Sequence, residues 1–176
     1  MPKATDFNVG AGIKAPRKLL KVYVDANSLD GSAENDWELV GRGVEESAIE
    51  LNPNTETVTD ITGITETSVE KWEPNQSFEP NTVRGGSKLN FLLHQIWQEK
   101  APEKLSKFNV LIVYAYINGS NESSFEAEKQ TNCTINITSI GGSSYVDMPI
   151  EISYSNESVQ GMVTYSDGTS PTFTVA

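Results

Sequence analysis

The chain has 176 residues, a length that predicts a single domain spanning 1–176. With 13 basic and 24 acidic side chains the formal net charge is −11, which argues against nucleic-acid binding, because neutralising phosphates needs a basic surface. A single cysteine, Cys133, excludes a disulfide framework within the chain, and a single histidine, His94, leaves no Cys/His zinc site.

Apolar runs in the sequence are short. The longest, Val110–Ile117, is far below the roughly 20 residues that a bilayer-spanning helix needs. Residues 1–12 are polar and contain no apolar stretch of signal-peptide length. We therefore expect a protein that is made and kept inside the cell and that has no membrane partner.

The first part of the chain predicts two strands after an N-terminal segment of about residues 1–16. Leu20, Val22 and Val24 alternate with polar residues, as in a strand with one buried face. Trp37–Leu51 also has the composition of a strand, with a bulge expected at the two glycines of Gly41–Gly43.

The next segment is prone to β structure but has no clear period. Asn52–Thr55 has the composition of a turn, with proline at its second position. We interpret residues 52–63 as an extended arm whose partner lies on another chain, and Thr65–Trp72 as the following strand. The chain then leads out of this region through two prolines, Pro74 and Pro80. The candidate residues for contacts between rings in the arm are Asn52, Pro53, Asn54, Thr55, Glu56, Thr57 and Val58.

One amphipathic helix is predicted over residues 87–100. Ser87 is the expected N-cap, Lys100 lies in the last turn and Pro102 stops the helix. Its apolar stripe should cover one face of a sheet, whereas His94 lies off the stripe and is expected at the surface. The stripe consists of Leu89, Leu92, Leu93, Ile96 and Trp97.

The last third predicts further strands. Phe108–Ile117 is apolar at both parities, so it should be a central strand buried on both sides. Residues 132–138 and 146–154 alternate around Gly141–Ser144, which predicts a hairpin with one apolar and one polar face. Val159–Tyr165 and Thr172–Val175 form an expected closing pair, joined by a turn at residues 167–169.

Catalytic and ligand-binding patterns are missing from the sequence. No nucleophile motif lies beside His94. A dinucleotide-binding loop follows a strand, whereas the glycines at 10–12 follow none. No segment has the spacing of a calcium loop, although abundant carboxylates leave a glycosidase pair open. We predict no catalytic residue, no metal site, no cofactor and no enzymatic activity.

The order of several short motifs resembles the major tail proteins of long-tailed phages of Gram-positive bacteria. The motifs are Val40-Gly-Arg-Gly-Val-Glu, then Glu50-Leu-Asn-Pro-Asn-Thr-Glu-Thr, then Trp72-Glu-Pro-Asn-Gln-Ser-Phe, followed by the helix and the long apolar strand. The resemblance covers roughly Lys18–Ile152. It implies a tail-tube-like β-sandwich or partial barrel of antiparallel strands with one flanking helix.

The same resemblance implies a structural virion protein. Such proteins form hexameric rings that stack into a tube, and the tube conducts DNA during ejection without binding it specifically. The implied partners are copies of the chain and other tail proteins, namely the tape measure, the terminator and the distal tail protein. The implied location is the virion tail, assembled in the cytoplasm of the host bacterium.

Carboxylates are concentrated in one stretch, since Glu34–Glu79 holds twelve acids against two bases, Arg42 and Lys71. An acidic lumen would repel the phosphates of passing DNA. Strand parity predicts the polar residues that face the pore. They are Glu46, Glu50, Glu66, Glu70, Asn132, Asn136, Asp147 and Glu151.

Two alternatives remain open at this point. A secreted or surface β-sandwich, such as an adhesin or a carbohydrate-binding module, fits the Thr, Ser and Asn content. Another virion component, such as a decoration or tail-terminator protein, fits the fold features equally well. The alternative role of the candidate pore acids is to keep the outer surface of the protein soluble.

Overall fold

The computed structural model describes residues 7–120, 123–166 and 170–176. Most of the regular structure in these residues is β, and all strand pairs are antiparallel. The elements are η2 (Arg17–Leu19), β1 (Leu20–Asp25), β2 (Trp37–Val40), β3 (Pro53–Thr59), β4 (Thr65–Trp72), β5 (Asn75–Phe78), α1 (Lys88–Glu99), η3 (Pro102–Ser106), β6 (Phe108–Asn118), β7 (Ser124–Ile137), β8 (Ile150–Ser153), β9 (Ser158–Tyr165) and β10 (Pro171–Val175).

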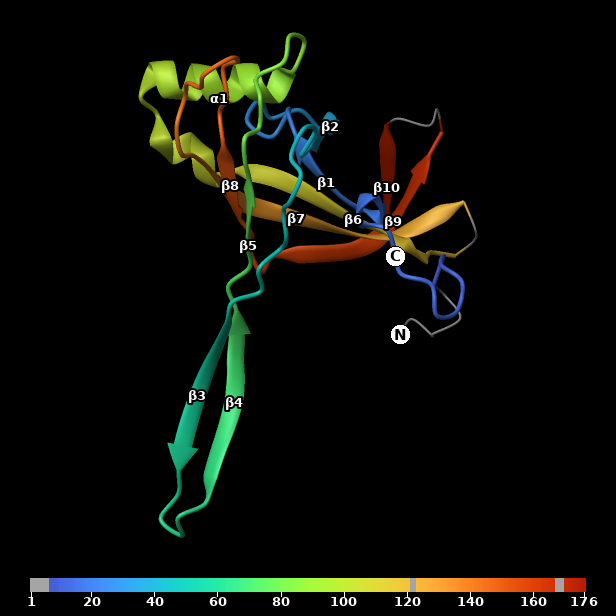
Figure 1. Cartoon of the computed structure of the whole chain (residues 1–176), viewed down its shortest axis with the longest axis vertical. Coiled ribbons are helices and arrows are strands. Elements are labelled where there is room, and N and C mark those ends of the chain that lie inside the picture. The colour runs from blue at the N-terminus through green and yellow to red at the C-terminus, as the bar shows by residue number, and fades with distance from the viewer. Residues whose placement is uncertain (1–6, 121–122, 167–169) are drawn as a thin grey trace.

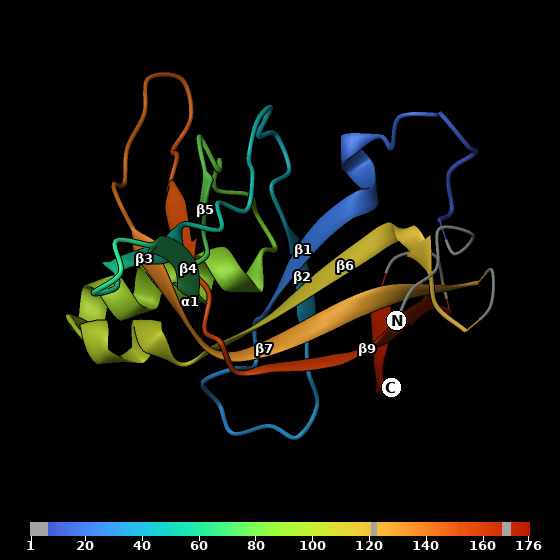
Figure 2. The same cartoon turned by 90° about the horizontal axis from the view of Figure 1, so that it is seen from below.

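An eight-stranded sheet forms the body of the molecule. Its main path runs β10-β9-β7-β6-β1-β2, while β8 pairs with β7 and with β5. The long strand β7 pairs with β6 and β9 along most of its length and with β8 at its end, so it belongs to both parts of the sheet. The sheet curves into an open half-barrel, with α1 beside β5 and β8 (Figure 2). The prediction of a mainly β, antiparallel partial barrel with one flanking helix is confirmed.

Strand β6 lies at the centre of the sheet and is buried on both faces, as its sequence predicts. Phe108, Val110 and Ile112 join the core cluster beneath α1. Leu111 and Val113 point to the opposite face, where they pack with Tyr23 and Val163 in a second cluster. Two apolar faces on one strand therefore connect two cores.

Helix α1 begins and ends close to the predicted positions. The Ser87 hydroxyl accepts a hydrogen bond from the Asn90 amide, and Lys100 ends the helix in the left-handed conformation. Leu89, Leu93 and Ile96 are buried in the first core. Trp97 was expected on the buried stripe, but it is 54% exposed and its ring lies under the Lys100 ammonium instead.

Several strand bounds differ from the sequence-based expectations. The strand that starts at Trp37 ends at Val40, because Gly41 and Gly43 take positive φ angles of 98° and 83° and lead into a loop. Pro53 begins a strand rather than occupying a turn, and Asn75–Phe78 is a strand that the flanking prolines obscured. In the hairpin predicted over residues 132–138 and 146–154, the second strand pairs with the first from Ile150 onward rather than from Val146.

The closing pair of strands is confirmed by the register of β9 with β10, in which Val163 pairs with Phe173. The turn predicted at residues 167–169 lies outside the described residues. Of the N-terminal segment, residues 7–16 are described, and Phe7 forms a β-bridge with Ile117 while its ring stacks on Tyr116.

Candidate functional site

The most distinctive feature of the surface is a hairpin formed by β3 and β4, which projects from the body as a separate two-stranded sheet (Figure 1). Every residue of both strands is exposed. The expectation that residues 52–63 have no partner in their own chain is wrong. Pro53–Thr59 pairs with Thr65–Trp72, and the projecting arm is the whole hairpin, residues 53–72.

The two faces of this hairpin differ in chemistry, because residues that pair directly across a ladder share a face. One face is a ladder of β-branched side chains, in which the hydroxyls of Thr57 and Thr67 lie 3.1 Å apart and those of Thr59 and Thr65 lie 3.0 Å apart. The other face carries the acids, with Glu56 opposite Ser68 and Glu66 opposite Val58. The hairpin has no buried face, and even Val69 is 52% exposed.

The tip of the hairpin is a tight turn organised by Asp60. Its carboxylate accepts hydrogen bonds from the Thr62 hydroxyl, the Thr62 amide and the Ile64 amide. These bonds hold the pKa of Asp60 below its usual value. Ile61 and Ile64 are exposed at this tip, so the hairpin ends in two exposed apolar side chains.

At the base of the hairpin the two chain segments that enter and leave it pair with each other, and the Asn156 side chain of the body donates to the Trp72 carbonyl at 3.4 Å. Glu50 forms a β-bridge with Asn75, and the Glu73 amide donates to the Leu51 and Asn52 carbonyls at 3.1 and 3.3 Å. Asn52 takes a positive φ of 42°, and its side chain donates to the Glu73 carbonyl at 3.2 Å. The hairpin is therefore held at its root and free along its length.

The eight candidate pore residues do not gather in one place. Asn136 and Glu151 pair across β7 and β8 and lie on the face opposite the buried Ile135 and Ile152. Glu46 and Glu50 lie in the exposed segment that leads to the hairpin, and Glu66 and Glu70 lie on β4 itself.

The two remaining candidates are engaged with neighbouring groups. The Thr82 hydroxyl donates to Asp147 at 2.7 Å, and the Asn132 side chain donates to Glu157 at 2.9 Å. Whether any of the eight residues faces a lumen stays a prediction.

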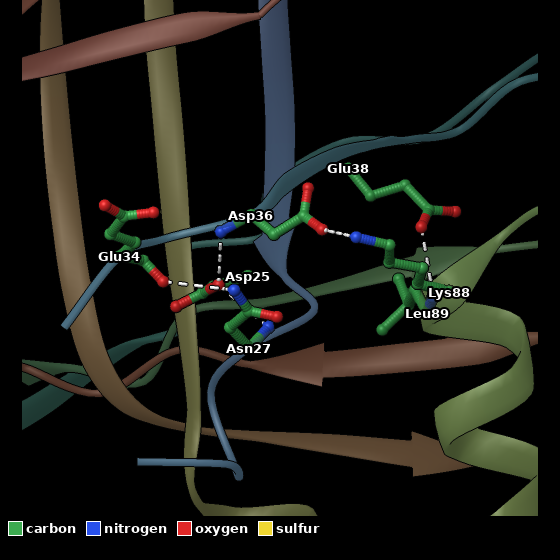
Figure 3. A network of polar contacts seen from close by, with 7 residues as sticks. All are labelled: Asp25, Asn27, Glu34, Asp36, Glu38, Lys88 and Leu89. Atoms are coloured by element: carbon green, nitrogen blue, oxygen red, sulfur yellow. Dashed lines mark hydrogen bonds and ion pairs between the residues drawn. The ribbon is translucent and has the colours of Figure 1, made fainter. Parts of the chain in front are cut away.

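A polar network that the sequence analysis did not identify fixes the loop between β1 and β2 (Figure 3). Asp25, only 1% exposed, accepts hydrogen bonds from the Asn27 amide at 3.0 Å and the Asp36 amide at 2.8 Å. Side-chain amides of Asn35 and Asn109 donate to its other oxygen at 2.6 and 3.2 Å. An acid at the end of an alternating strand was the available signal, but one of the donors, Asn109, lies 84 residues further along the chain.

The same region is connected to the start of α1. Glu38 on β2 accepts from the Leu89 amide at 3.0 Å and from the Ser87 hydroxyl, and Lys88 forms an ion pair with Asp36 (Figure 3). A carboxylate at a helix N-terminus is favoured by the helix dipole. Glu38 therefore links the edge strand β2 to the helix.

A second chain of hydrogen bonds runs from the buried Tyr154 to the surface near the root of the hairpin. The Tyr154 hydroxyl donates to Gln76 at 2.6 Å, and the Gln76 amide donates to the Ser47 hydroxyl at 2.9 Å. Ser47 donates in turn to the Ser77 carbonyl and accepts two hydrogen bonds from Arg17 at its own carbonyl. Burial raises the pKa of Tyr154, so its hydroxyl stays protonated as the donor.

Within residues 7–120, 123–166 and 170–176, no three His, Cys, Asp or Glu side chains are grouped so that they could hold a metal ion. No helix in these ranges is long and apolar enough to cross a membrane.

Comparison with known proteins finds a likeness in structure alone. No family model and no curated protein matches the sequence. The fold is similar to a chain of the PVC sheath/tube terminator of an extracellular contractile injection system in its extended state, with a TM-score of 0.52 and 11% identity over 86% of this chain and 99% of that one. It is also similar to a chain of the PVC sheath-tube complex, with a TM-score of 0.50 and 11% identity over 88% of this chain and 95% of that one.

A third match is the anti-feeding prophage cap (AFP tube terminating cap), with a TM-score of 0.48 and 11% identity over 94% of this chain and 100% of that one. At such low identity a likeness concerns the fold. The chain shares the fold of components of contractile, phage-tail-like particles.

Proposed function

We propose that the chain is a structural protein of a phage-tail-like tube and acts by assembling with copies of itself into a ring that terminates the tube. The observation that carries the proposal is the β3–β4 hairpin. A two-stranded sheet exposed on both faces is marginally stable by itself, and its two unpaired edges are available for another chain. A surface of this kind is costly in a monomer and useful in an assembly.

The terminator position is supported by the likeness in fold to the PVC sheath/tube terminator, which extends over 99% of that chain. A terminator ring contacts the tube on one side and stops its growth on the other. A hairpin that leaves the body in one direction fits this polarity (Figure 1).

A second candidate is the repeating unit of the tube, as the resemblance to major tail proteins implies. The fold likeness to a chain of the PVC sheath-tube complex favours it. A tube unit needs the hairpin of each ring to fit the opposite side of the next ring, so that assembly continues. Six copies per ring is the expected number in both cases.

The pore face follows from the same proposal. The polar side of the β5–β8–β7 ladder lies opposite the core and carries the exposed Asn136 and the half-buried Glu151. Carboxylates repeated around a ring would repel DNA phosphates, although salt screens the field beyond about 8 Å at physiological ionic strength.

Electron microscopy of the purified protein over a range of concentrations tests the function. Single rings of constant thickness support the terminator, and open-ended tubes support the tube unit. Strict monomers at every concentration contradict both and favour a β-sandwich binding module.

A hairpin deletion provides the matched variant. Asn52 and Glu73 are hydrogen-bonded at the root, so a short glycine-serine turn can replace residues 53–72. The deleted protein should keep its circular dichroism spectrum and its melting temperature within a few degrees, because the hairpin contributes no buried residue. It should form neither rings nor tubes, and rings with normal stability would contradict the role of the hairpin.

A further inference from the structure

A groove beside β1 and the loop after β2 gathers positive charge on a chain that is otherwise strongly acidic. The groove has a volume of about 450 Å³ and is lined by four cationic side chains and one acid, Glu45. Its floor is apolar and includes Val22, Val40 and Phe78. The four cations are Arg17, Lys18, Lys21 and Arg42.

These cations lack acidic partners within residues 7–120, 123–166 and 170–176, where the ion pairs involve other lysines. Arg17 donates to neutral carbonyl oxygens of Leu20 and Ser47, which fix its guanidinium without cancelling its charge. The Lys21 ammonium lies 4.9 Å from the centre of the Tyr165 ring. Lys18 and Arg42 are exposed. The groove therefore presents an excess of positive charge, four cations against one acid, around an apolar floor.

The acidic face of the hairpin has the complementary composition. Glu56, Glu66 and Glu70 are exposed and form no ion pair in the described part of the molecule, since Lys71 pairs with Glu73 instead. Val58 shares this face and is 54% exposed, so the face offers an apolar contact between its charges. Glu66 and Glu70 lie on the same strand, and Glu70 is the extra residue of a β-bulge between Val69, which pairs with Thr55, and Lys71, which pairs with Asn54.

We infer that the acidic face of the hairpin of one copy docks into the basic groove of a second copy, with Glu66 and Glu70 facing Lys18 and Arg42. The hairpin of the same copy is excluded as the occupant because it points away from the body, whereas the groove lies within the body (Figure 1). This inference rests on the proposed function, since it names the surface that receives the hairpin. It assigns Glu66 and Glu70 to a protein contact rather than to a lumen.

Charge reversal followed by charge exchange tests the pairing. The hairpin variant is Glu66→Lys with Glu70→Lys, and the groove variant is Lys18→Glu with Arg42→Glu. All four residues are exposed, so both variants should keep the circular dichroism spectrum and melting temperature of the wild type. The control variant, Glu103→Lys with Lys107→Glu, changes exposed charges on and beside η3, away from both surfaces.

The assay is the protein concentration at half-maximal assembly, measured by light scattering and confirmed by electron microscopy. Each reversal should raise this concentration by at least about tenfold, because like charges then meet across the contact. Mixing the two variants creates contacts of correct sign only between unlike copies, and combining all four substitutions in one chain should restore assembly to near the wild-type value. Raising the salt from 0.1 to 1 M should weaken wild-type assembly, since the screening length falls from about 10 Å to about 3 Å.

The possible outcomes separate this inference from the function on which it rests. Assembly of both reversal variants at the wild-type concentration overturns the docking while the tube function stands. Loss of assembly in both reversals without restoration in the combined variant also overturns it, because the acids and the groove then have different partners. A wild-type protein that stays monomeric under all conditions overturns the proposed function and the docking together.

Discussion

Replacing Asp25 by alanine should destabilise the protein strongly without touching the hairpin or the groove. The carboxylate is almost fully buried and accepts four hydrogen bonds, two from backbone amides and two from asparagine side chains. A hydrogen bond to a charged group contributes roughly 1.5–3 kcal/mol, and a buried donor left unpaired costs about as much. Water can reach the loop side of the network, so we expect a loss of about 3–4 kcal/mol in the free energy of unfolding.

Urea denaturation followed by circular dichroism measures this loss directly. For a chain of this size about 1 kcal/mol corresponds to about 2–4 °C, so the melting temperature should fall by roughly 10 °C. Asp25→Asn keeps one carbonyl acceptor and should fall between the alanine variant and the wild type. Asp30→Ala is the control, since this exposed acid of the same loop accepts one hydrogen bond, from the Ser32 amide. A loss below about 1 kcal/mol for Asp25→Ala would refute the reasoning, because the donors would then be satisfied without the carboxylate.

Three further predictions concern the helix and the hairpin tip. Leu93→Ala should cost about 2–5 kcal/mol in urea denaturation because this fully buried side chain leaves a cavity, whereas the exposed neighbour His94→Ala should be neutral. Ser87→Ala should cost about 1–2 kcal/mol, because the Asn90 amide loses its cap, and an unchanged unfolding midpoint would contradict that role. The folded pKa of Asp60 is lowered, so its contribution is present above the unfolded pKa and is lost as the pH falls through the folded value. NMR titration should therefore show the hairpin turn losing order at a pH below the usual titration range of an aspartate, and a titration at the usual pKa would contradict the Asp60 contacts.

The elements that the sequence predicts correctly are those with a strong apolar pattern. Strand β6 is apolar at both parities in a short run, and α1 has an apolar stripe of helical period with a cap at Ser87, so length and period together distinguish the two elements. Strand β3 was misread because both of its faces are exposed, and a strand without a buried face has no apolar period. Strand β5 was missed because it is four residues long and buries Gln76, a polar residue, between two prolines.

The candidate site was harder to predict than the fold. Charge alone located the acids of the hairpin, but the groove combines residues 17–22 with residues 39–45, which only the β1–β2 pairing brings together. Asp25 illustrates the same limit, because its donors come from positions up to 84 residues away in the chain.

The way the hairpin is rooted has a mechanical consequence. Strand β5 continues the line of β4 into the body and pairs with β8, which pairs with the end of β7 (Figure 1). A pull along the hairpin therefore loads the β5–β8 ladder in shear, so that its hydrogen bonds must break together rather than one after another. Tension then passes through β7 into β6 and β9, the central strands of the half-barrel. An arm attached in this way transmits force to the whole sheet.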